Sequence, residues 1–469
     1  MKVKVQVVIE SESGETKLFE EVALLERDEL QSETLGLNLS EAQALLQGVQ
    51  RTIVFEQVEE YLQQQQACHD CGMKRYHKDE REIVYRTLFG RLRLRSPRLF
   101  HCKCQLQPTR TFSPLANLLT ERTAPERLYL ESKFASLMSY GLTTKLLEEV
   151  LPLEGEVNAA TVRNHLQQVA QRMEGELGEE QAMFASGCQR EWEKLPRPEL
   201  PLTVGIDGGY VHGCHQPSNK SGWFEVIVGK SITADGNSKC FGLVNGYDKK
   251  PKRRLFELLK SQGMQMNQQV TFLSDGGDTV RELQLYLNPQ AEHLLDWFHV
   301  TMRLTVMNQM AKGLGTKKSQ LCAQALKDLE RIKWYLWHGN VFRALQIIED
   351  LDLTLDDDNL APEQRKLLKS VREFQTYIEN NANFIPNYGE RYRCDERIST
   401  GFAESTVNQV ISKRFVKKQQ MRWTQCGAHL LLQVRTRVLD EELEPTFRRW
   451  YPTFRQVCQE LGDDIELAA

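Results

Sequence analysis

Two short stretches of the sequence share one design, in which an apolar segment ends in a single aspartate followed by two glycines. The first stretch is Leu202–Val211, which contains Asp207, and the second is Val270–Gly277, which contains Asp275. Each apolar segment is typical of a buried strand. If the two strands are neighbours, both carboxylates lie at one edge of a sheet, where like charges repel unless a cation lies between them. The pair predicts a divalent-metal site, although either aspartate alone would also serve to cap the turn that follows it.

A third acid, Glu404, is the first acidic residue of a predicted helix, and residues 405–437 then carry seven Lys or Arg and no Asp or Glu. The helix dipole alone can explain a glutamate in a first turn. A carboxylate at the head of a basic segment also suits a metal ligand beside a DNA backbone. Asp278 and Asp296 remain alternative ligands. The residues of this segment that are expected to contact DNA are Lys413, Arg414, Lys417, Lys418, Arg422 and Trp423. For the tryptophan, packing in the core is the favoured role, and stacking on a flipped base is the other.

Asp207, Asp275 and Glu404 together would hold two Mg²⁺ or Mn²⁺ ions roughly 4 Å apart, because hard cations prefer oxygen ligands. In such a site one ion activates a water or a 3′-hydroxyl, and the other stabilises the leaving oxygen of a phosphodiester. His299 is expected either to orient a carboxylate or the DNA strand, or to be a structural histidine. The predicted chemistry is therefore cleavage and joining of nucleic acid.

Two close cysteine pairs, Cys68/Cys71 and Cys102/Cys104, flank a predicted hairpin around Gly90. This layout predicts a zinc ribbon, in which four thiolates hold one structural Zn²⁺. The cysteines could instead be unrelated and free, and the tight second pair leaves room for His69, His77 or His101 to replace one sulfur. One face of the hairpin is expected to pack on the zinc knuckle, while the other offers arginines to phosphates, chiefly Arg91, Arg93 and Arg95.

Helical patterns at 124–140 and 143–150, followed by a helix that Asn158 caps, predict a helix-turn-helix. Arg163 and Asn164, near the start of the last helix, are the residues expected to reach DNA, together with Thr161 and Gln167. Three packed helices are also common in proteins that do not bind DNA.

The elements that must position the acids follow the order strand, strand, strand, helix, strand, helix, strand. The strands are expected at 202–211, 222–232, 239–247, 270–277 and 292–300. This is a ribonuclease-H-like order, in which the first and fourth strands are neighbours, and no GxGxxG follows the first strand as in a dinucleotide-binding fold. The predicted fold is a multidomain α/β protein with a ribonuclease-H-like core and an all-α insertion.

The 469 residues carry a net charge of −4, unevenly distributed. Residues 1–66 hold five Lys or Arg against thirteen Asp or Glu, whereas residues 74–104 hold ten against three. Basic regions in an otherwise acidic chain suit a protein that meets a polyanion on some faces only. No apolar run is long enough to span a bilayer, and eleven cysteines, an odd number, argue against a disulfide framework. The cytoplasm is the expected compartment.

The sequence predicts seven segments. They are an acidic hairpin and helix (1–66), a four-cysteine module (67–112), a helix-turn-helix region (113–176), the first part of the core (200–300), a helical insertion (301–395), the core helix with the third acid (396–440) and a tail (441–469).

The motifs GIDGG at Asp207, FLSDGG at Asp275, DWFH at 296–299 and AESTVNQVISKRF…MRW at 404–423 resemble those of the DDE transposases of bacterial insertion sequences. The similarity is to the Mutator-like superfamily, and most of all to Kra-type elements, and it covers most of the chain from Cys68 to about Trp450. It implies that Asp207, Asp275 and Glu404 form the DDE triad. It also implies that DWFH is the C/D-x-x-H signature and that the helical insertion is a family trait. Gln419 and Gln420 depart from the basic residue and glycine expected before Met421.

The resemblance implies a transposase that binds transposon ends, cleaves DNA with two metal ions and joins the freed 3′-hydroxyl to target DNA. Its partner would be double-stranded DNA in the bacterial nucleoid, and pairing two ends implies a homodimer or a larger assembly. Two other classes stay open, namely a nuclease that cuts without joining and a DNA-binding protein with an idle site.

Overall fold

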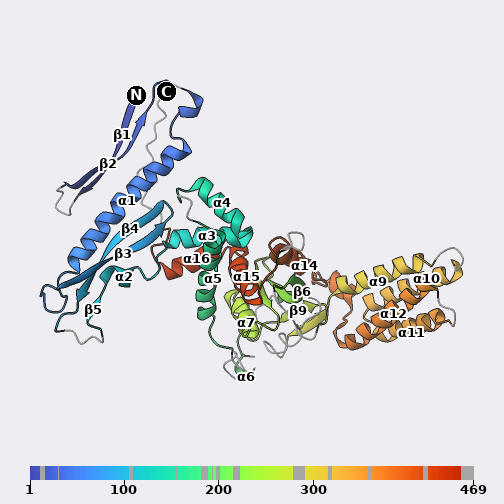
Figure 1. The fold of residues 1–469 in the computed structure, drawn as a ribbon. Coiled ribbons are helices and arrows are strands. Elements are labelled where there is room, and N and C mark those ends of the chain that lie inside the picture. The colour runs from blue at the N-terminus through green and yellow to red at the C-terminus, as the bar shows by residue number, and fades with distance from the viewer. Residues whose placement is uncertain are drawn as a thin grey trace. The chain divides into compact units, whose positions relative to one another are not determined.

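The computed structural model describes residues 1–10, 16–29, 31–104, 109–153, 157–180, 189–192, 194–196, 201–214, 222–277, 291–314, 319–357, 361–415 and 421–455. The chain divides into two compact units (Figure 1). Unit 1 comprises residues 1–169 and 441–469, and unit 2 comprises residues 170–440. None of the helices in the described ranges combines the length and apolar character needed to cross a membrane.

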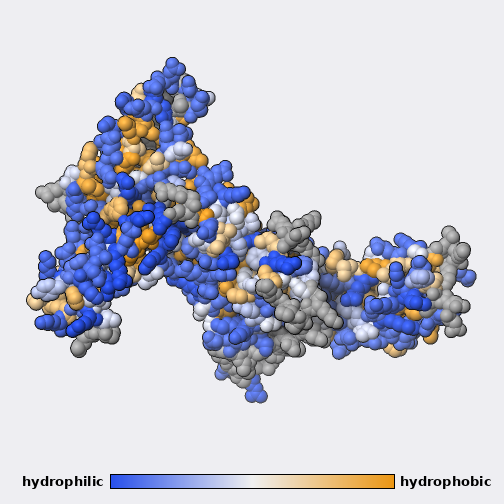
Figure 2. Space-filling view, in the orientation of Figure 1, coloured by the Kyte–Doolittle hydropathy of each residue, from blue (hydrophilic) through white to orange (hydrophobic). Residues whose placement is uncertain are grey.

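Unit 1 begins with the predicted hairpin, formed by β1 (Lys2–Glu10) and β2 (Thr16–Glu26) in antiparallel pairing. The turn between them lies outside the described residues. After a short 3₁₀ turn, η1 (Ser32–Thr34), comes the long helix α1 (Leu39–Gln64). Asn38 starts α1 by a reciprocal capping box with Glu41. Figure 2 shows apolar residues on the surface of this hairpin and helix.

The four-cysteine module contains a hairpin of β3 (His77–Thr87) and β4 (Gly90–Phe100), with the short strand β5 (Thr111–Phe112) beside β4. Gly90 has a φ of 117°, a conformation that favours glycine at this turn. The apolar face of the hairpin, with Leu92 and Leu94, packs on α1 and on α2 (Pro114–Leu118). The prediction that this face packs on the zinc knuckle is therefore wrong, because the long helix supplies the apolar partner.

Three helices follow, of which the third continues into unit 2, and a fourth helix of unit 1 comes from the part of the chain after unit 2. The predicted cap at Asn158 is confirmed, since its side chain accepts a hydrogen bond of 2.8 Å from the Thr161 backbone. The second helix, predicted at 143–150, begins earlier, at Tyr140, because Ser139 caps it. The four helices are α3 (Pro125–Leu137), α4 (Tyr140–Val150), α5 (Ala159–Glu176) and α16 (Leu443–Trp450).

Helix α16 lies in the segment that the sequence gives only as a tail. The ring of Phe447 meets the ring of Tyr129 on α3 edge-on, with centroids 5.4 Å apart. The Tyr451 hydroxyl donates to Glu121, and Arg455 pairs with Glu126 at 3.1 Å. The described part of this segment is thus an integral part of unit 1.

Unit 2 contains a mixed five-stranded sheet with the order β10-β9-β6-β7-β8. The first three strands along the chain, β6, β7 and β8, are antiparallel, whereas β9 is parallel to β6 and β10 is parallel to β9. The predicted pairing of the first and fourth strands is confirmed, and the helix predicted at 279–287 lies outside the described residues. The strands are β6 (Leu202–His212), β7 (Trp223–Ile232), β8 (Ser238–Val244), β9 (Val270–Ser274) and β10 (Glu292–Leu295).

Helices cover both faces of this sheet. Val204 and Ile206 of β6 share a core with Leu255 and Leu259 of α7 (Pro251–Ser261). The opposite face is covered by α14 (Gly401–Val407), which continues into a π-helical turn, η4 (Asn408–Ser412), and by α15 (Gln425–Leu439). A short helix, α6 (Gln189–Trp192), precedes the sheet.

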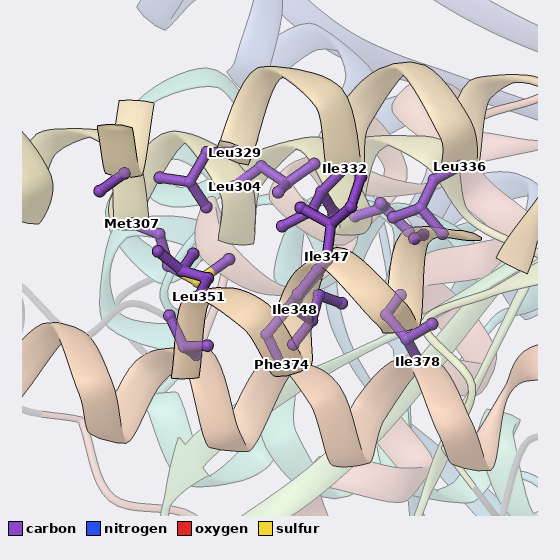
Figure 3. Packing of buried hydrophobic residues seen from close by; sticks show 14 of the residues in the cluster. Leu304, Met307, Leu329, Ile332, Leu336, Ile347, Ile348, Leu351, Phe374 and Ile378 are labelled. Carbon is purple, nitrogen blue, oxygen red and sulfur yellow. The ribbon is translucent and has the colours of Figure 1, made fainter. Parts of the chain in front are cut away.

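The predicted helical insertion is present, and its core is formed by apolar residues such as Leu304, Ile332, Ile348 and Phe374 (Figure 3). It starts earlier than predicted, because β10 ends at Leu295 and the next residue caps a helix. Its elements are α9 (Trp297–Lys312), α10 (Ser319–Trp337), α11 (Val341–Leu355), α12 (Pro362–Asn380), the 3₁₀ turn η3 (Ala382–Phe384) and α13 (Tyr388–Arg393).

Candidate functional site

Asp207 and Asp275 lie at the same level of two neighbouring parallel strands. The register between β6 and β9 runs from Leu202 opposite Val270 to Gly205 opposite Leu273, a constant offset. Continued by two residues, it sets Asp207 opposite Asp275, on strands that are about 4.8 Å apart. The two carboxylates therefore share one edge of the sheet, as the sequence predicts.

Asp207 is half-buried in an acidic environment, and its carboxylate accepts a 2.7 Å hydrogen bond from the Gly208 backbone. Burial raises the pKa of Asp207, and the nearby carboxylates of Asp275 and Asp296 raise it further, while the Gly208 N–H and His299 act in the opposite direction. Asp275 is exposed and accepts a 3.0 Å bond from Gly277. A pair of carboxylates that disfavour each other's charge is suited to bind a cation.

Two glycines of β6 let helix α14 lie directly on the strand. A Cβ on Gly205 would lie only 2.6 Å from the Phe402 ring, and a Cβ on Gly209 would lie 2.9 Å from the Ile411 side chain. Neither contact is possible for a larger residue without a shift of the helix. Asp207 lies between these glycines on the same face of the strand, because side chains alternate along a strand.

Glu404 lies on the helix that packs on this strand. The residues of α14 and η4 that a Cβ at Gly205 or Gly209 would meet are Phe402, Ala403, Val407 and Ile411. Glu404 directly follows Ala403 and is half-buried. The two glycines after Asp207 have different neighbours. Gly209 makes room for the helix, and Gly208 faces Glu225 on the other side of the strand.

Asp207, Asp275 and Glu404 do not form a tight cluster of ligand atoms. Within the part of the chain that the structure describes, two groups of potential ligands have all their ligand atoms within 4.8 Å of one another, and neither contains Asp207, Asp275 or Glu404. Oxygen donors alone favour Mg²⁺ or Mn²⁺ over softer metals.

Asp296, one of the alternative ligands, is fully buried and committed to other contacts. Its carboxylate accepts hydrogen bonds from the backbone of Phe298 at 2.8 Å and of Thr400 at 3.1 Å, and from the Thr400 hydroxyl. Burial raises the pKa of Asp296 against these bonds. His299 lies 3.6 Å from the same carboxylate, at the edge that carries the acids. The other alternative, Asp278, lies outside the described residues.

The basic segment after Glu404 divides into exposed and buried cations. Lys413 and Arg422 are exposed, as a DNA contact requires, and Lys417 and Lys418 lie outside the described residues. Arg414 is only 2% exposed, with its guanidinium 5.1 Å from the centre of the Trp423 ring. Trp423 is 6% exposed, and its ring lies 4.9 Å from the Phe415 ring at an angle of 52°. The prediction that Arg414 and Trp423 contact DNA is not supported, because both are core residues.

The backbone hydrogen bonds of Trp423 explain why this residue is buried. Its N–H donates to the His212 carbonyl at 2.8 Å, and its carbonyl accepts from Cys214 at 2.9 Å, so it extends the sheet beside the end of β6. A residue built into a sheet edge is unable to swing out to a base. The alternative role that the sequence allows for Trp423, packing in the core, is the one observed.

The four predicted cysteines of unit 1 come together, with all four sulfurs within 4.8 Å of one another. The separations are 3.5 Å for Cys68–Cys104, 3.3 Å for Cys71–Cys102 and 3.4 Å for Cys71–Cys104. Tetrahedral Zn–S bonds of about 2.3 Å correspond to sulfurs about 3.8 Å apart, so the cluster fits one zinc. A hydrogen bond from the Asp70 backbone helps lower the pKa of the Cys68 thiol to about 7, which favours the thiolate.

The histidine alternatives at the cysteine site are not needed. His101 stacks on Phe112 with ring centroids 4.5 Å apart. The group of close ligands consists of the four cysteines alone, within the residues that the structure covers.

The hairpin arginines alternate with buried leucines as predicted. Arg93 and Arg95 are exposed and face Glu82 and Glu80 across the hairpin at 3.5 and 3.9 Å. Arg91 is partly buried. The acidic strand beside them reduces the positive charge that a phosphate would meet at this face.

Arg163 and Asn164 are both exposed on α5, as the predicted DNA contact requires. The helix is held from its inner face by Glu131, which is fully buried, hydrogen-bonds to His165, and pairs with Arg127 at 2.8 Å. The exposed polar side is thus presented on a fixed helix.

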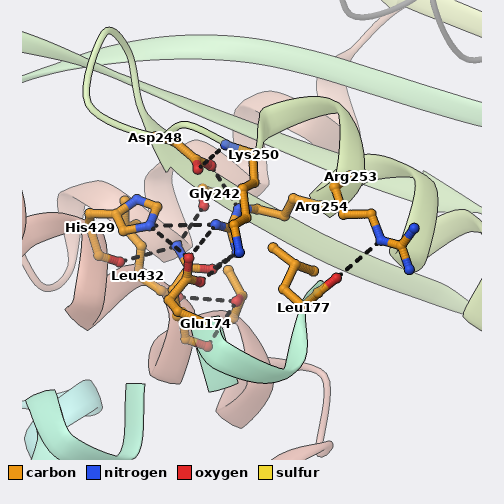
Figure 4. Close-up of polar contacts among 11 residues, drawn as sticks. Glu174, Leu177, Gly242, Asp248, Lys250, Arg253, Arg254, His429 and Leu432 are labelled. Atoms are coloured by element: carbon orange, nitrogen blue, oxygen red, sulfur yellow. Dashed lines mark hydrogen bonds and ion pairs between the residues drawn. The ribbon is translucent and has the colours of Figure 1, made fainter. Parts of the chain in front are cut away.

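Unit 2 contains a cluster of two acids and a histidine that the sequence does not predict (Figure 4). Glu174, Asp248 and His429 lie close together, but the Arg254 guanidinium already occupies the space among them. It pairs with Glu174 at 2.9 Å and with Asp248 at 2.9 Å. A fixed cation at this position makes the cluster an internal ion network and not a metal site. These residues are far apart in the sequence and have no shared motif, so no sequence signal points to them.

No protein-family model matches the chain, and no curated protein sequence is similar to it. Among solved structures, the chain is similar to one described as a Drosophila P element transposase strand transfer complex. The sequence identity is 10% and the TM-score 0.32, over 68% of this chain and 93% of that chain. A similarity of this degree does not establish a family or a function for this chain.

Proposed function

We propose that this chain is a DNA transposase that uses Asp207, Asp275 and Glu404 as ligands for two divalent cations. The observation that carries the proposal is the register of β6 and β9 together with the packing of α14 on Gly205 and Gly209. These two features support a site in which acids from distant parts of the chain meet at one edge of a sheet. The resemblance of the surrounding motifs to DDE transposases of bacterial insertion sequences, in the Mutator-like superfamily and Kra-type elements, supports the same function.

The sheet supports a ribonuclease-H-like core. Three antiparallel strands are followed by two parallel ones, in the order β10-β9-β6-β7-β8, and helices cover both faces. A helical insertion between the second and third acids agrees with the proposed family.

The side chains of the site have distinct roles in this proposal. When bound, the cations would supply an activated oxygen nucleophile and neutralise the leaving oxygen. Asp207 and Asp275 would hold the cations from the sheet, and Glu404 from the helix. His299 would orient the strand or a carboxylate nearby. Lys413 and Arg422, which are exposed, would hold the DNA backbone together with Lys417 and Lys418.

Unit 1 would supply the binding of transposon ends. The exposed polar face of α5, with Arg163 and Asn164, is suited to reach base edges, and Arg91, Arg93 and Arg95 to reach phosphates. The four cysteines would hold a structural Zn²⁺ that fixes the hairpin. We further propose that two or more copies assemble to pair two DNA ends.

The proposal is tested by cleavage of labelled DNA that carries the flanks of the gene, with and without Mg²⁺. Asp207→Asn, Asp275→Asn and Glu404→Gln should each abolish Mg²⁺-dependent cleavage and leave end binding intact, because the charge is lost while the shape is kept. Asp357→Asn, at an exposed acid of the helical insertion, is the matched control and should cleave normally. Full cleavage by one of the three variants would remove that residue from the site.

A strand-transfer assay with pre-cleaved ends separates a transposase from a nuclease. The proposal expects joined products that depend on the same three acids. Cleavage without joining would instead assign the chain to the nucleases.

A further inference from the structure

The turn that carries Asp275 packs against the helical insertion. Gly276, the next residue, has a φ of 88°, and a Cβ at this position would overlap the side-chain oxygen of Asn381 at the end of α12. Asn381 itself is only 4% exposed. The proposed metal ligand Asp275 is therefore next to a buried contact with the insertion.

Asn381 connects this turn to Tyr377, one helical turn earlier on α12. Its side-chain amide donates to the Tyr377 carbonyl at 2.9 Å. Burial raises the pKa of Tyr377, and Arg303 lowers it. The charges of Asp275 and Asp296 also raise this pKa. The aromatic ring of Tyr377 thus lies near two acids of the site and near one cation.

Arg303 is that cation, and it comes from α9, which packs beside α12 (Figure 1). It is exposed and follows His299 by four residues, so the two side chains share one face of the helix. The Arg303 guanidinium lies 4.2 Å from the centre of the Tyr377 ring. Arg303 forms no ion pair with an acid in the described ranges, so its charge is not neutralised by a neighbouring carboxylate.

This position leaves the hydrogen-bond donors of Arg303 available to a ligand. A guanidinium over an aromatic ring is held by its face and keeps its N–H groups at the rim, in the geometry that binds a phosphate through two bonds. An arginine that paired with Asp275 would instead neutralise a carboxylate of the proposed metal site. The contact with Tyr377 therefore keeps a positive charge next to the acids and separate from them.

We propose that Arg303 binds a phosphate of the DNA strand that lies at the three acids, and that the Tyr377 ring positions its guanidinium. This inference rests on the proposed transposase function and adds the helical insertion to the site. A phosphodiester carries a negative charge, which Arg303 would hold from the insertion, beside the turn that carries Asp275. Arg303 is then a substrate-binding residue, and Tyr377 is a positioning residue.

The test is single-turnover cleavage, with Mg²⁺, of labelled DNA that carries the flanks of the gene, over a range of protein and salt concentrations. Arg303→Ala should raise the half-saturating protein concentration by about 10-fold, because a charged hydrogen-bond donor is lost, and leave the rate at saturation nearly unchanged. The slope of log affinity against log salt should fall by roughly one unit, as expected for one lost phosphate contact.

Arg365→Ala is the matched control for this measurement. Arg365 is also an exposed arginine of the insertion, near the start of α12 and roughly 18 Å along the helix from Tyr377. This variant should cleave with the half-saturating concentration of the wild type. Both variants should melt as the wild type does, because both side chains are exposed.

The role of Tyr377 is tested by combining variants. Tyr377→Leu should weaken binding when Arg303 is present and have little effect in the Arg303→Ala background, because no guanidinium is left to position. Tyr377→Phe keeps the ring and should restore most of the affinity that Tyr377→Leu loses. An equal loss with and without Arg303 would show that Tyr377 acts through the fold alone and would overturn the proposed positioning.

The outcomes separate this inference from the proposed function. If the wild type cleaves and Arg303→Ala has the same half-saturating concentration as Arg365→Ala, the phosphate contact is wrong and the transposase function stands. If the wild type does not cleave the DNA, the proposed function is wrong, and the role of Arg303 falls with it.

Discussion

At the scale of single residues, Asp296 joins the starts of two helices that are distant in the sequence. Its carboxylate binds the backbone of Phe298 at the start of α9, and both the backbone and the hydroxyl of Thr400 at the start of α14. Glu404 lies one turn after Thr400. Asp296 therefore fixes the position of the third acid while its own oxygens are occupied.

We expect Asp296→Asn to lower the free energy of unfolding by about 2–4 kcal/mol, because buried donors lose a charged acceptor. Thr400→Ala keeps the carboxylate and removes one hydroxyl, and should cost only about 1 kcal/mol. Urea titration followed by circular dichroism measures both variants. Equal losses would show that the carboxylate contributes no more than the hydroxyl bond.

The ion network around Arg254 predicts a specific acid sensitivity. Burial raises the pKa of Glu174, but hydrogen bonds from His429 and Arg254 outweigh it and lower the value from 4.5 to about 2. A carboxyl group with a lowered pKa stabilises the fold fully above pH 4.5 and loses that contribution as the pH falls toward 2.

Glu174→Gln should therefore remove part of the pH dependence of stability. Between pH 6 and the acid limit, the wild type should lose roughly 3 kcal/mol more than the variant. Urea unfolding at a series of pH values measures the difference. Parallel curves for the two proteins would mean that Glu174 titrates normally in the fold.

At the scale of elements, the contact between β6 and α14 depends on two glycines, Gly205 and Gly209, on one face of the strand. Gly205→Ala should cost about 1–3 kcal/mol and reduce cleavage strongly, because the new Cβ displaces the helix that carries Glu404. Gly208→Ala is the matched control on the other face, where a Cβ would lie 3.2 Å from the flexible end of Glu225. Thermal unfolding and the cleavage assay are compared for both. A Gly205→Ala protein as active as Gly208→Ala would disprove the close packing.

Elements with strong local signals were predictable from sequence, and elements defined by distant partners were not. The two hairpins, the α5 cap at Asn158 and the pairing of β6 with β9 follow from alternation, turn residues and apolar runs. The strand predicted to reach Val300 stops at Leu295, because Asp296 caps helix α9. Asp296 also binds Thr400, a residue distant in the sequence, and the sequence pattern gives no sign of this contact. The sequence pattern assigns Arg414 and Trp423 to a DNA-binding surface, because it does not reveal that the Arg414 guanidinium lies over the buried Trp423 ring.

At the scale of the whole molecule, the cysteine cluster predicts a metal content. The purified chain should contain one zinc, and Cys102→Ser should lose it and melt at a lower temperature in unit 1, because the metal closes the hairpin module. Cys394→Ser, at an exposed cysteine of unit 2, is the control and should retain zinc. Elemental analysis and a chelator titration measure both. Full zinc content in Cys102→Ser would reject the four-thiolate site.

The return of α16 to α3 has a consequence for how the protein is made. Unit 1 is formed by residues on both sides of unit 2 in the sequence, so unit 2 interrupts it. All of unit 2 must therefore be synthesised before Phe447 is available to cover Tyr129. A translation product that stops within unit 2 would leave that aromatic surface bare.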